Sequence, residues 1–411
     1  KRRLKPSETM FILTSDVKTA EEGDMHFNYY MPTRVIFGRG RLKELAQAEL
    51  PGKKALIVIT GGNSMRKFGY LDKVQALLRE NGVDSTVFDK VLPNPIEAHV
   101  EEAAELARRE ECDFVIGLGG GSAIDSAKSI AIMVNNGDNR YWDYLKGKAS
   151  IMQPVLPIVA IPTTAGTGTE ADPWTVITNA DTNEKIGFGI DATFPRLSIV
   201  DPELMVSVPP LFTAYQGMDA FFHSAEGYLA NVAQPVSDLY ALDSIRRITE
   251  FLPQAVENGQ NLQAREQMAW ASTQAGMVES MSSCISEHSM EHALSAFYPD
   301  LPHGAGLVAL SLPYYGYLMK KEKNKIAVRY MEMSRAMGEA GNGPEDFLTA
   351  LRKLIKAVGL DDLKLSSWGV SPEEAEKLAE NSFLAMGGLY NLDPIRLDRH
   401  DAACIIREAI H

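Results

Sequence analysis

The sequence predicts an α/β domain followed by an all-helical domain. In the first half of the chain, short apolar runs alternate with helical stretches, which is typical of a parallel, Rossmann-like sheet with helices on its faces. Beyond residue 201 the pattern is almost entirely helical, and the segment 201–210 carries three prolines and indicates a hinge. We expect the α/β domain at residues 25–206, the helical domain at residues 207–411, and an extension or cloning remnant at residues 1–24.

Composition and charge exclude several classes of protein. The chain has 411 residues, 45% of them hydrophobic and 23% charged, which suits a globular core and argues against global disorder. A net charge of −13 argues against binding to nucleic acid or to anionic membranes. Apolar runs stay shorter than the ~18 residues of a membrane span. Three widely spaced cysteines exclude a disulfide framework and favour a reducing cytoplasm.

The expected elements follow from hydrophobic periodicity and from glycine and proline boundaries. The run ALIVIT is typical of a buried strand. We expect strands at residues 35–37, 55–60, 84–88, 113–118 and 157–161, and helices between them at 70–81, 95–109 and 122–133. In the helical domain we expect helices at 213–230, 235–251, 265–292, 303–319, 324–337, 344–358 and 372–385.

A glycine-rich turn follows the strand at 113–118. Gly119, Gly120 and Gly121 let a phosphate approach the backbone, and the start of the next helix offers free N–H groups to an anion. Ser122 can be both the N-cap of that helix and a phosphate ligand. The spacing is not GxGxxG, and a tight turn without a ligand is the simpler alternative.

A second polar loop follows the strand at 157–161. It places the hydroxyls of Thr163, Thr164 and Thr167 beside two glycines. Taken alone, this segment is better interpreted as an ordinary polar loop. Two such loops after strands of one parallel sheet favour a dinucleotide, because ligands bind at the carboxyl ends of the strands. A cleft between the two domains is then the expected site of chemistry.

Histidines gather in one short window. The chain has eight histidines, and His288, His292 and His303 fall within 16 residues. His288 and His292 are four residues apart and share a helical face, as do Asp219 and His223. Imidazole and carboxylate together suit Zn²⁺ or Fe²⁺. Hydrogen-bonded interior histidines are the alternative, and five candidates exceed a four-ligand site, so one is expected to act outside the ligand set.

Four segments together resemble the iron-containing (group III) alcohol dehydrogenases, whose fold is related to dehydroquinate synthase and glycerol dehydrogenase. They are GGGSAIDSAK, PTTAGTGTE, GMDAFFHSAEGY and HSMEHALSAFYPDLPHG. The resemblance implies a divalent metal, iron before zinc, held by Asp219, His223, His288 and His303, with His292 near the nicotinamide. It implies cofactor contacts at Asn94, Gly119, Gly120, Gly121, Ser122, Asp125, Thr163, Thr164, Thr167 and Lys185. Relatives are often homodimers.

Some positions depart from the family pattern. Asp172 stands where several relatives carry a small hydroxyl or amide, and Trp174 is bulky for its place near the cofactor end. Glu279 stands where an aromatic side chain often faces the substrate. The gap from His292 to His303 is one residue longer than in some members. These departures concern the identity of the substrate rather than the reaction.

The segment after the second strand bears on cofactor choice. NAD-preferring enzymes commonly place a carboxylate there to bind the ribose hydroxyls. This chain has Gly61, Gly62, Asn63 and Ser64 instead, with Arg66 and Lys67 nearby, so we expect this segment to contact the cofactor and to accept a 2′-phosphate. The segment resembles that of NADPH-linked butanol and aldehyde reductases, and NADP(H) is predicted over NAD(H).

The expected reaction interconverts a small primary alcohol and its aldehyde by hydride transfer. A dication held by one carboxylate and three neutral imidazoles keeps about one positive charge, which lowers the pKa of an alcohol. His292 is the candidate for passing the proton to solvent. The alternatives are a polyol dehydrogenase of the glycerol type, a dehydroquinate-synthase-like lyase, and a nucleotide-binding protein without turnover.

Overall fold

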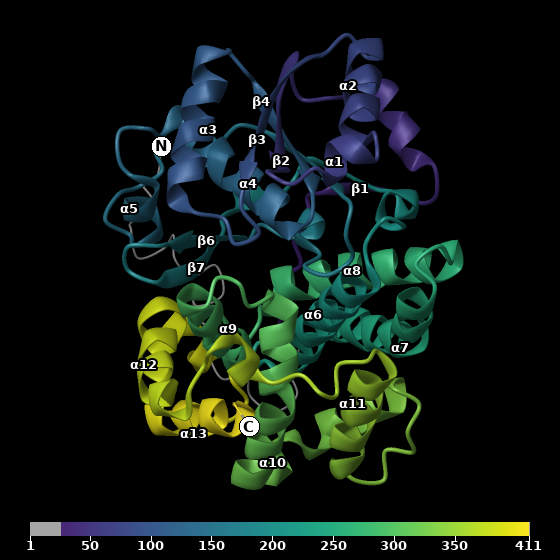
Figure 1. The fold of residues 1–411 in the computed structure, drawn as a ribbon, viewed down its shortest axis with the longest axis vertical. Coiled ribbons are helices and arrows are strands. Elements are labelled where there is room, and N and C mark those ends of the chain that lie inside the picture. The colour runs from purple at the N-terminus through teal and green to yellow at the C-terminus, as the bar shows by residue number, and fades with distance from the viewer. Residues whose placement is uncertain (1–25, 411) are drawn as a thin grey trace. The chain divides into compact units, whose positions relative to one another are not determined.

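The computed structural model describes residues 26–410, so the expected extension at residues 1–24 lies outside the described part of the chain. The described residues form two compact units (Figure 1). Unit 1 comprises residues 26–163, 169–179 and 187–201, and unit 2 comprises residues 164–168, 180–186 and 202–410. The second unit therefore takes two short segments from the first half of the chain.

Unit 1 contains a six-stranded parallel sheet, which confirms the predicted fold class. The strand order is β1-β8-β5-β4-β2-β3. The central strands are apolar and buried on both faces, as expected for a parallel sheet covered by helices. The strands are β1 (Arg34–Phe37), β2 (Lys54–Thr60), β3 (Asp84–Val91), β4 (Phe114–Gly119), β5 (Ile158–Pro162) and β8 (Leu197–Val200).

The helices of unit 1 are α1 (Ser64–Lys67), α2 (Tyr70–Glu80), α3 (Glu97–Arg109), α4 (Gly121–Asn135) and α5 (Tyr141–Leu145). Three of the five, α2, α3 and α4, lie where the periodicity predicts them, and the short helices α1 and α5 were not predicted. The helix α4 packs so closely against β4 at Gly117 that a Cβ there would lie 2.7 Å from Ile124 Cα. Residues 26–33, which precede β1, are irregular.

Three strands were not predicted. They are β8, at the sheet position next to β1, and β6 (Thr175–Asn179) and β7 (Glu184–Phe188), which form a two-stranded sheet. Short 3₁₀ helices occur at Arg41–Ala46, Thr169–Ala171, Asp191–Thr193, Pro202–Met205, Leu365–Trp368, Pro372–Glu374 and Gly387–Asn391. The predicted hinge at 201–210 contains one of these 3₁₀ helices, and its last residue, Pro210, is the first residue of α6.

Unit 2 is helical, as predicted. Its helices are α6 (Pro210–Leu229), α7 (Pro235–Glu257), α8 (Leu262–Ser282), α9 (Ser286–Phe297), α10 (His303–Ala336), α11 (Glu345–Ala357), α12 (Ala375–Met386) and α13 (Arg399–Ala409). The helix expected at 265–292 is two helices, because the backbone turns at Ser283, whose φ is 65°. The helices expected at 303–319 and 324–337 form the single element α10, which is kinked at Glu322.

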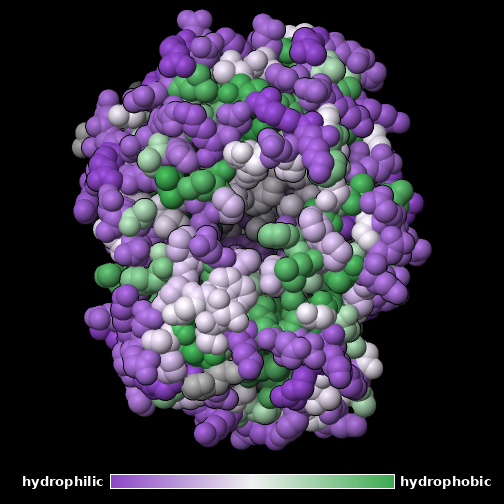
Figure 2. Space-filling model, viewed as in Figure 1, coloured by the Kyte–Doolittle hydropathy of each residue, from purple (hydrophilic) through white to green (hydrophobic). Residues whose placement is uncertain are grey.

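The helices α6, α7 and α8 form the core of unit 2. The Ser224 hydroxyl donates to Ser244 Oγ (2.8 Å), which donates in turn to the Ala271 carbonyl on α8 (3.0 Å). Among residues 26–410, no helix is long and apolar enough to span a bilayer. On the face drawn in Figure 2, hydrophilic residues dominate and hydrophobic residues form small patches.

Candidate metal and cofactor site

The helix α6 carries the first pair of predicted metal ligands. Asp219 and His223 are four residues apart, so both point from the same side of α6, and both are buried. Sixteen of the twenty residues of α6 are buried, and small residues let its neighbours approach closely. A Cβ at Gly217 would lie 2.2 Å from Leu252 of α7. The burial of a carboxylate on such a helix calls for a compensating positive charge.

Three imidazoles surround the Asp219 carboxylate. The distances from Asp219 Oδ1 to the Nε2 atoms are 3.9 Å for His223 on α6, 3.7 Å for His288 on α9 and 3.4 Å for His303. His303 is the first residue of α10. Asp219 Oδ1 and His288 Nε2 have no hydrogen-bond partner among the described residues. An ion with bonds of about 2.0–2.2 Å to oxygen and nitrogen would satisfy both atoms, so the donor set fits a divalent cation.

Two buried glutamates orient the imidazoles. Glu226 Oε1 pairs with His288 Nδ1, and Glu291 Oε2 pairs with His303 Nδ1. Each pairing directs the remaining Nε2 toward Asp219, which is the usual arrangement of carboxylate, histidine and metal. The sequence reasoning missed both glutamates. An acidic residue one turn from a candidate ligand on an apolar helix was the available signal.

The electrostatics of the cluster favour a cation. Burial would raise the pKa of Asp219, but His223 and His303 outweigh burial and hold this pKa well below its usual value. Burial lowers the pKa of His223 to about 3, so its imidazole is neutral and able to bind a metal. Burial lowers the pKa of His288 and of His303, but neighbouring acidic groups, led by Cys284 and Glu226 for His288 and by Glu291 for His303, outweigh burial and raise both pKa values, so in the absence of an ion these two imidazoles carry the positive charge that offsets the buried carboxylates.

His292 lies beside the cluster. Its ring centroid is 6.3 Å from that of His288 and 5.6 Å from that of His303. Burial, followed by the charge of Lys185, lowers the pKa of His292 well below its usual value, so this imidazole is neutral. Lys185, on β7, donates to Ser295 Oγ (2.8 Å) and lies 3.6 Å from Glu291 Oε2. Lys185 thus lies within the polar surroundings of the predicted metal site.

In unit 1, the predicted phosphate-binding residues follow three neighbouring strands. Gly61 follows β2, Gly119 ends β4, and Thr163 follows β5, and the three strands are adjacent and parallel. Their carboxyl ends lie at one edge of the sheet, where Thr163 N donates to Gly119 O (2.8 Å). Gly119 has φ 153°, a conformation that favours glycine, and Gly121 begins α4. The backbone N–H groups at the start of α4 are suited to an anion.

Ser122 is not an N-cap. Gly120 occupies that position, and the Ser122 hydroxyl donates to the Pro93 carbonyl (2.5 Å). Because Asn94 follows Pro93, this bond ties the loop that carries Asn94 to the glycine-rich turn. The N-cap prediction was wrong because the hydroxyl donates to an acceptor in another loop.

Asp125 holds the backbone near the glycine-rich turn. Its carboxylate accepts from the Thr169 hydroxyl (2.7 Å) and from Val176 N (3.0 Å). One turn later on α4, the fully buried Lys128 donates to Asp172 Oδ1 (2.9 Å) and to the Trp174 carbonyl (2.6 Å). The two family departures, Asp172 and Trp174, therefore have a structural role in the same network.

The remaining predicted cofactor residues lie on loops. Asn63 and Ser64 begin the short helix α1 after Gly62, and Arg66 pairs with Asp89 on β3 (2.6 Å). Thr164 and Thr167 belong to the segment 164–168 of unit 2, where Gly168 packs against the backbone of α8. In unit 2, Glu279 Oε2 lies 3.7 Å from His223 Nε2, so this departure from the family pattern adjoins the metal cluster.

Comparisons with known proteins agree with this geometry. The family model described as iron-containing alcohol dehydrogenase matches residues 32–202, and the model of the C-terminal domain of that family matches residues 213–410. The NAD-dependent methanol dehydrogenase of Bacillus methanolicus is 35% identical, over 87% of this chain and 93% of its own. The NADPH-dependent butanol dehydrogenase of Clostridium saccharobutylicum is 35% identical, over 80% of this chain and 82% of its own.

Solved structures show the same similarity. The crystal structure of an archaeal halo-thermophilic alcohol dehydrogenase from a Red Sea brine pool superimposes with a TM-score of 0.88. It is 34% identical and covers 94% of this chain and 99% of its own. The likeness therefore extends over both units rather than over the nucleotide-binding fold alone.

Proposed function

Because this chain belongs to the iron-containing alcohol dehydrogenase family, we propose that it interconverts a small primary alcohol and its aldehyde with NADP(H). Membership makes it an NAD(P)-dependent alcohol dehydrogenase. The chain length of the substrate, the metal, the ligand residues and the preference for NADP(H) are the parts proposed here. The polyol dehydrogenase and lyase alternatives are not favoured by the relatives, which are alcohol dehydrogenases.

One observation carries the proposed metal site. Asp219 Oδ1 is buried without a hydrogen-bond partner among the described residues, and the Nε2 atoms of three histidines lie 3.4–3.9 Å away. We assign Asp219, His223, His288 and His303 as the ligands of one divalent cation, iron before zinc. When bound, this cation supplies a positive charge that stabilises an alkoxide and polarises a carbonyl group.

The residues around the proposed ligands hold the site in a reactive form. Glu226 and Glu291 each engage an Nδ1 atom, so His288 and His303 present Nε2 in a fixed orientation. The neutral imidazole of His292 can accept the proton that an alcohol gives up on oxidation, and return it during aldehyde reduction. The nicotinamide supplies or accepts the hydride, so the protein needs no nucleophile of its own.

The preference for NADP(H) rests on the residues after β2. The two relatives described above use different cofactors, one NAD and one NADPH, so family membership leaves the choice open. Gly61 and Gly62 place no carboxylate where NAD-preferring enzymes commonly bind the ribose hydroxyls. A Cβ at Gly62 would meet nothing within 4 Å, so there is open space beside this residue. Ser64 and Lys67 offer a hydroxyl and a positive charge nearby, and the guanidinium of Arg66 beside them is paired with Asp89 (2.6 Å). This composition favours a cofactor with a 2′-phosphate over one with a free ribose hydroxyl.

Metal analysis combined with an aldehyde panel tests the proposal. His223→Ala is expected to lose both metal and turnover, whereas His292→Ala keeps the metal and turns over slowly. His400→Ala, on the exposed surface of α13, is the matched control and keeps both. If the purified His223→Ala protein keeps full metal content and turnover of butanal with NADPH, the ligand assignment is wrong.

Two further expectations concern the whole protein. A homodimer is proposed from the family. A reducing cytoplasm is proposed from the three cysteines, all of which are unpaired. Light scattering of the purified protein measures the oligomeric state directly, and a monomeric mass at micromolar concentration contradicts the dimer.

A further inference from the structure

We propose that Cys284 provides a sulfur ligand for thiophilic cations, in a second ligand set made of His223, Cys284 and His288. This inference rests on the proposed metal site, because it shares two imidazoles with that site. It adds a residue that the family resemblance does not include, and it concerns which metals the protein selects.

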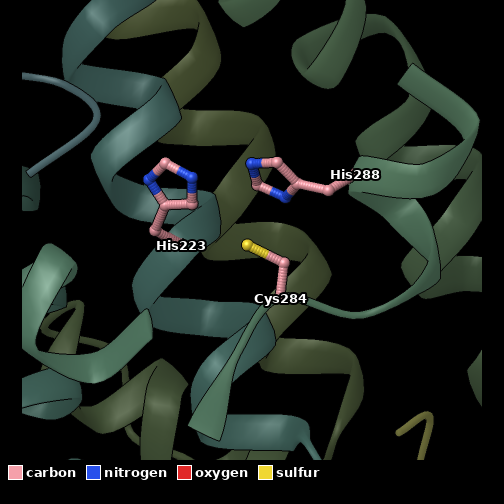
Figure 3. Close-up of side chains that lie close together, drawn as sticks. All are labelled: His223, Cys284 and His288. Atoms are coloured by element: carbon pink, nitrogen blue, oxygen red, sulfur yellow. The ribbon is translucent and has the colours of Figure 1, made fainter. Parts of the chain in front are cut away.

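The three side chains lie close together in unit 2 (Figure 3). One potential ligand atom of each residue lies within 4.8 Å of the others, and all three residues are buried. His223 comes from α6, His288 from α9, and Cys284 from the segment between α8 and α9, with its sulfur directed toward the two imidazoles. Ligands of a tetrahedral zinc ion lie roughly 3.5 Å apart, so modest side-chain movement completes the set.

The backbone around Cys284 is firmly held. Ser283 has φ 65°, an unfavourable conformation for a residue other than glycine, which ends α8 and starts the turn. The N–H of Ile285 donates to Glu226 Oε2 (2.7 Å), and a Cβ at Gly227 would lie 3.2 Å from the Ser283 carbonyl. Both contacts fix the turn against α6. These contacts hold the backbone of Cys284 in place next to the two imidazoles.

A second observation points to a ligand at this place. His288 is only 3% exposed, and its Nε2 atom has no hydrogen-bond partner among the described residues. Its Nδ1 atom is engaged by Glu226, so Nε2, which also faces Asp219 Oδ1 at 3.7 Å, is the atom available for coordination and is shared by the two ligand sets. The Cys284 thiol donates to Glu279 Oε1 (3.6 Å), and the other oxygen of Glu279 lies 3.7 Å from His223 Nε2. The Glu279 carboxylate thus contacts both Cys284 and His223.

The two ligand sets differ in chemical softness. Asp219 and His303 complete a set of oxygen and nitrogen donors, which suits harder ions such as Mn²⁺ and Fe²⁺. Cys284 adds a thiolate, which suits Zn²⁺ and Co²⁺. Because His223 and His288 belong to both sets, one ion at a time occupies the cluster. When the sulfur–metal bond forms, the thiol S–H bond breaks and its proton passes to the Glu279 carboxylate and on to solvent.

Cobalt provides a direct readout of the sulfur ligand. We would strip the full-length protein with a chelator, reload it with Co²⁺ and record its near-ultraviolet absorption. The expected result is a sulfur-to-cobalt charge-transfer band that is lost in Cys284→Ser and kept in Cys112→Ser, which removes a buried cysteine of unit 1. Stoichiometric Co²⁺ binding without this band, or a band that survives in Cys284→Ser, overturns the inference.

Metal affinities provide a second readout. It compares two metals in each of two variants, so the misfolding of one variant does not decide the result. Cys284→Ser is expected to weaken Zn²⁺ binding by about 10- to 100-fold while changing Mn²⁺ binding much less. Asp219→Asn is expected to weaken Mn²⁺ binding more than Zn²⁺ binding. Equal losses for both metals in both variants overturn the inference. Failure of the wild-type protein to bind any of these ions overturns the proposed function as well. Binding through nitrogen and oxygen ligands alone overturns the inference about Cys284 and leaves the proposed function intact.

Discussion

Replacing Gly168 by alanine tests how the segment 164–168 is fixed on unit 2. This glycine has φ 66°, and a Cβ there would lie 2.2 Å from the Ser272 carbonyl oxygen and 2.4 Å from Gly276 N, both in the backbone of α8. The left-handed conformation alone costs an alanine about 1 kcal/mol. Forcing α8 away from the segment adds about 1–3 kcal/mol. We expect Gly168→Ala to lower the free energy of unfolding by about 2–4 kcal/mol.

A matched control separates the two contributions. Gly82 has nearly the same backbone angle, φ 71°, but a Cβ there would meet nothing within 4 Å. Gly82→Ala should therefore cost only the conformational part, about 1 kcal/mol. Urea denaturation followed by circular dichroism measures both variants. Equal losses for Gly168→Ala and Gly82→Ala would refute the reasoning.

The same contact has a functional consequence. Thr164 and Thr167 are carried by this segment, and both are predicted to contact the cofactor. In folded Gly168→Ala protein we expect a raised KM for NADPH with metal content unchanged. An unchanged KM would mean that the packing of Gly168 on α8 does not position these two threonines.

Three further predictions concern buried charges and the cofactor. Lys128→Met should lower the free energy of unfolding by about 3–5 kcal/mol, because it leaves Asp172 buried without its partner at 2.9 Å; a loss below about 1 kcal/mol in urea denaturation would contradict this. Burial raises the pKa of Asp393 to about 8, so ionisation opposes folding and stability falls as pH rises from about 4 to 8, by at most about 1.4 kcal/mol per pH unit. Asp393→Asn should flatten that dependence, and identical pH profiles for the two proteins would refute it. Gly62→Asp should lower kcat/KM for NADPH about tenfold, an effect of about 1.4 kcal/mol, while sparing NADH; equal effects on both cofactors would disprove the assignment of the 2′-phosphate position.

The predictable part of the site depends on local spacing. Asp219 and His223, like His288 and His292, are four residues apart, and a helix alone brings each pair to one face. His303 could be grouped with them only by its closeness in sequence, because a break separates it from α9, and its assignment as a ligand came from the resemblance. Glu226 was overlooked although it lies three residues after His223, since its partner is a side chain of another helix.

The errors in the predicted fold arise mainly from contacts between segments that are not adjacent in sequence. The break between α8 and α9 carries neither glycine nor proline, and Ser283 adopts its positive φ under tertiary constraints that periodicity does not contain. Ser122 looked like an N-cap, but the Pro93 carbonyl from another loop takes its hydroxyl. The strand β8 was missed although it is as long as β1, and it lies directly before the proline-rich segment that was interpreted as a hinge. Cys284 drew no attention because it lies in the break between α8 and α9, so its spacing of four residues from His288 does not correspond to a shared helical face.

Anomalous X-ray diffraction from crystals of the iron-loaded protein tests the central claim most directly. We predict a single peak at the iron absorption edge, about 2.0–2.2 Å from Asp219 Oδ1 and from the Nε2 atoms of His223, His288 and His303. An iron peak elsewhere in the molecule, with these four side chains hydrogen-bonded to one another, would contradict the account.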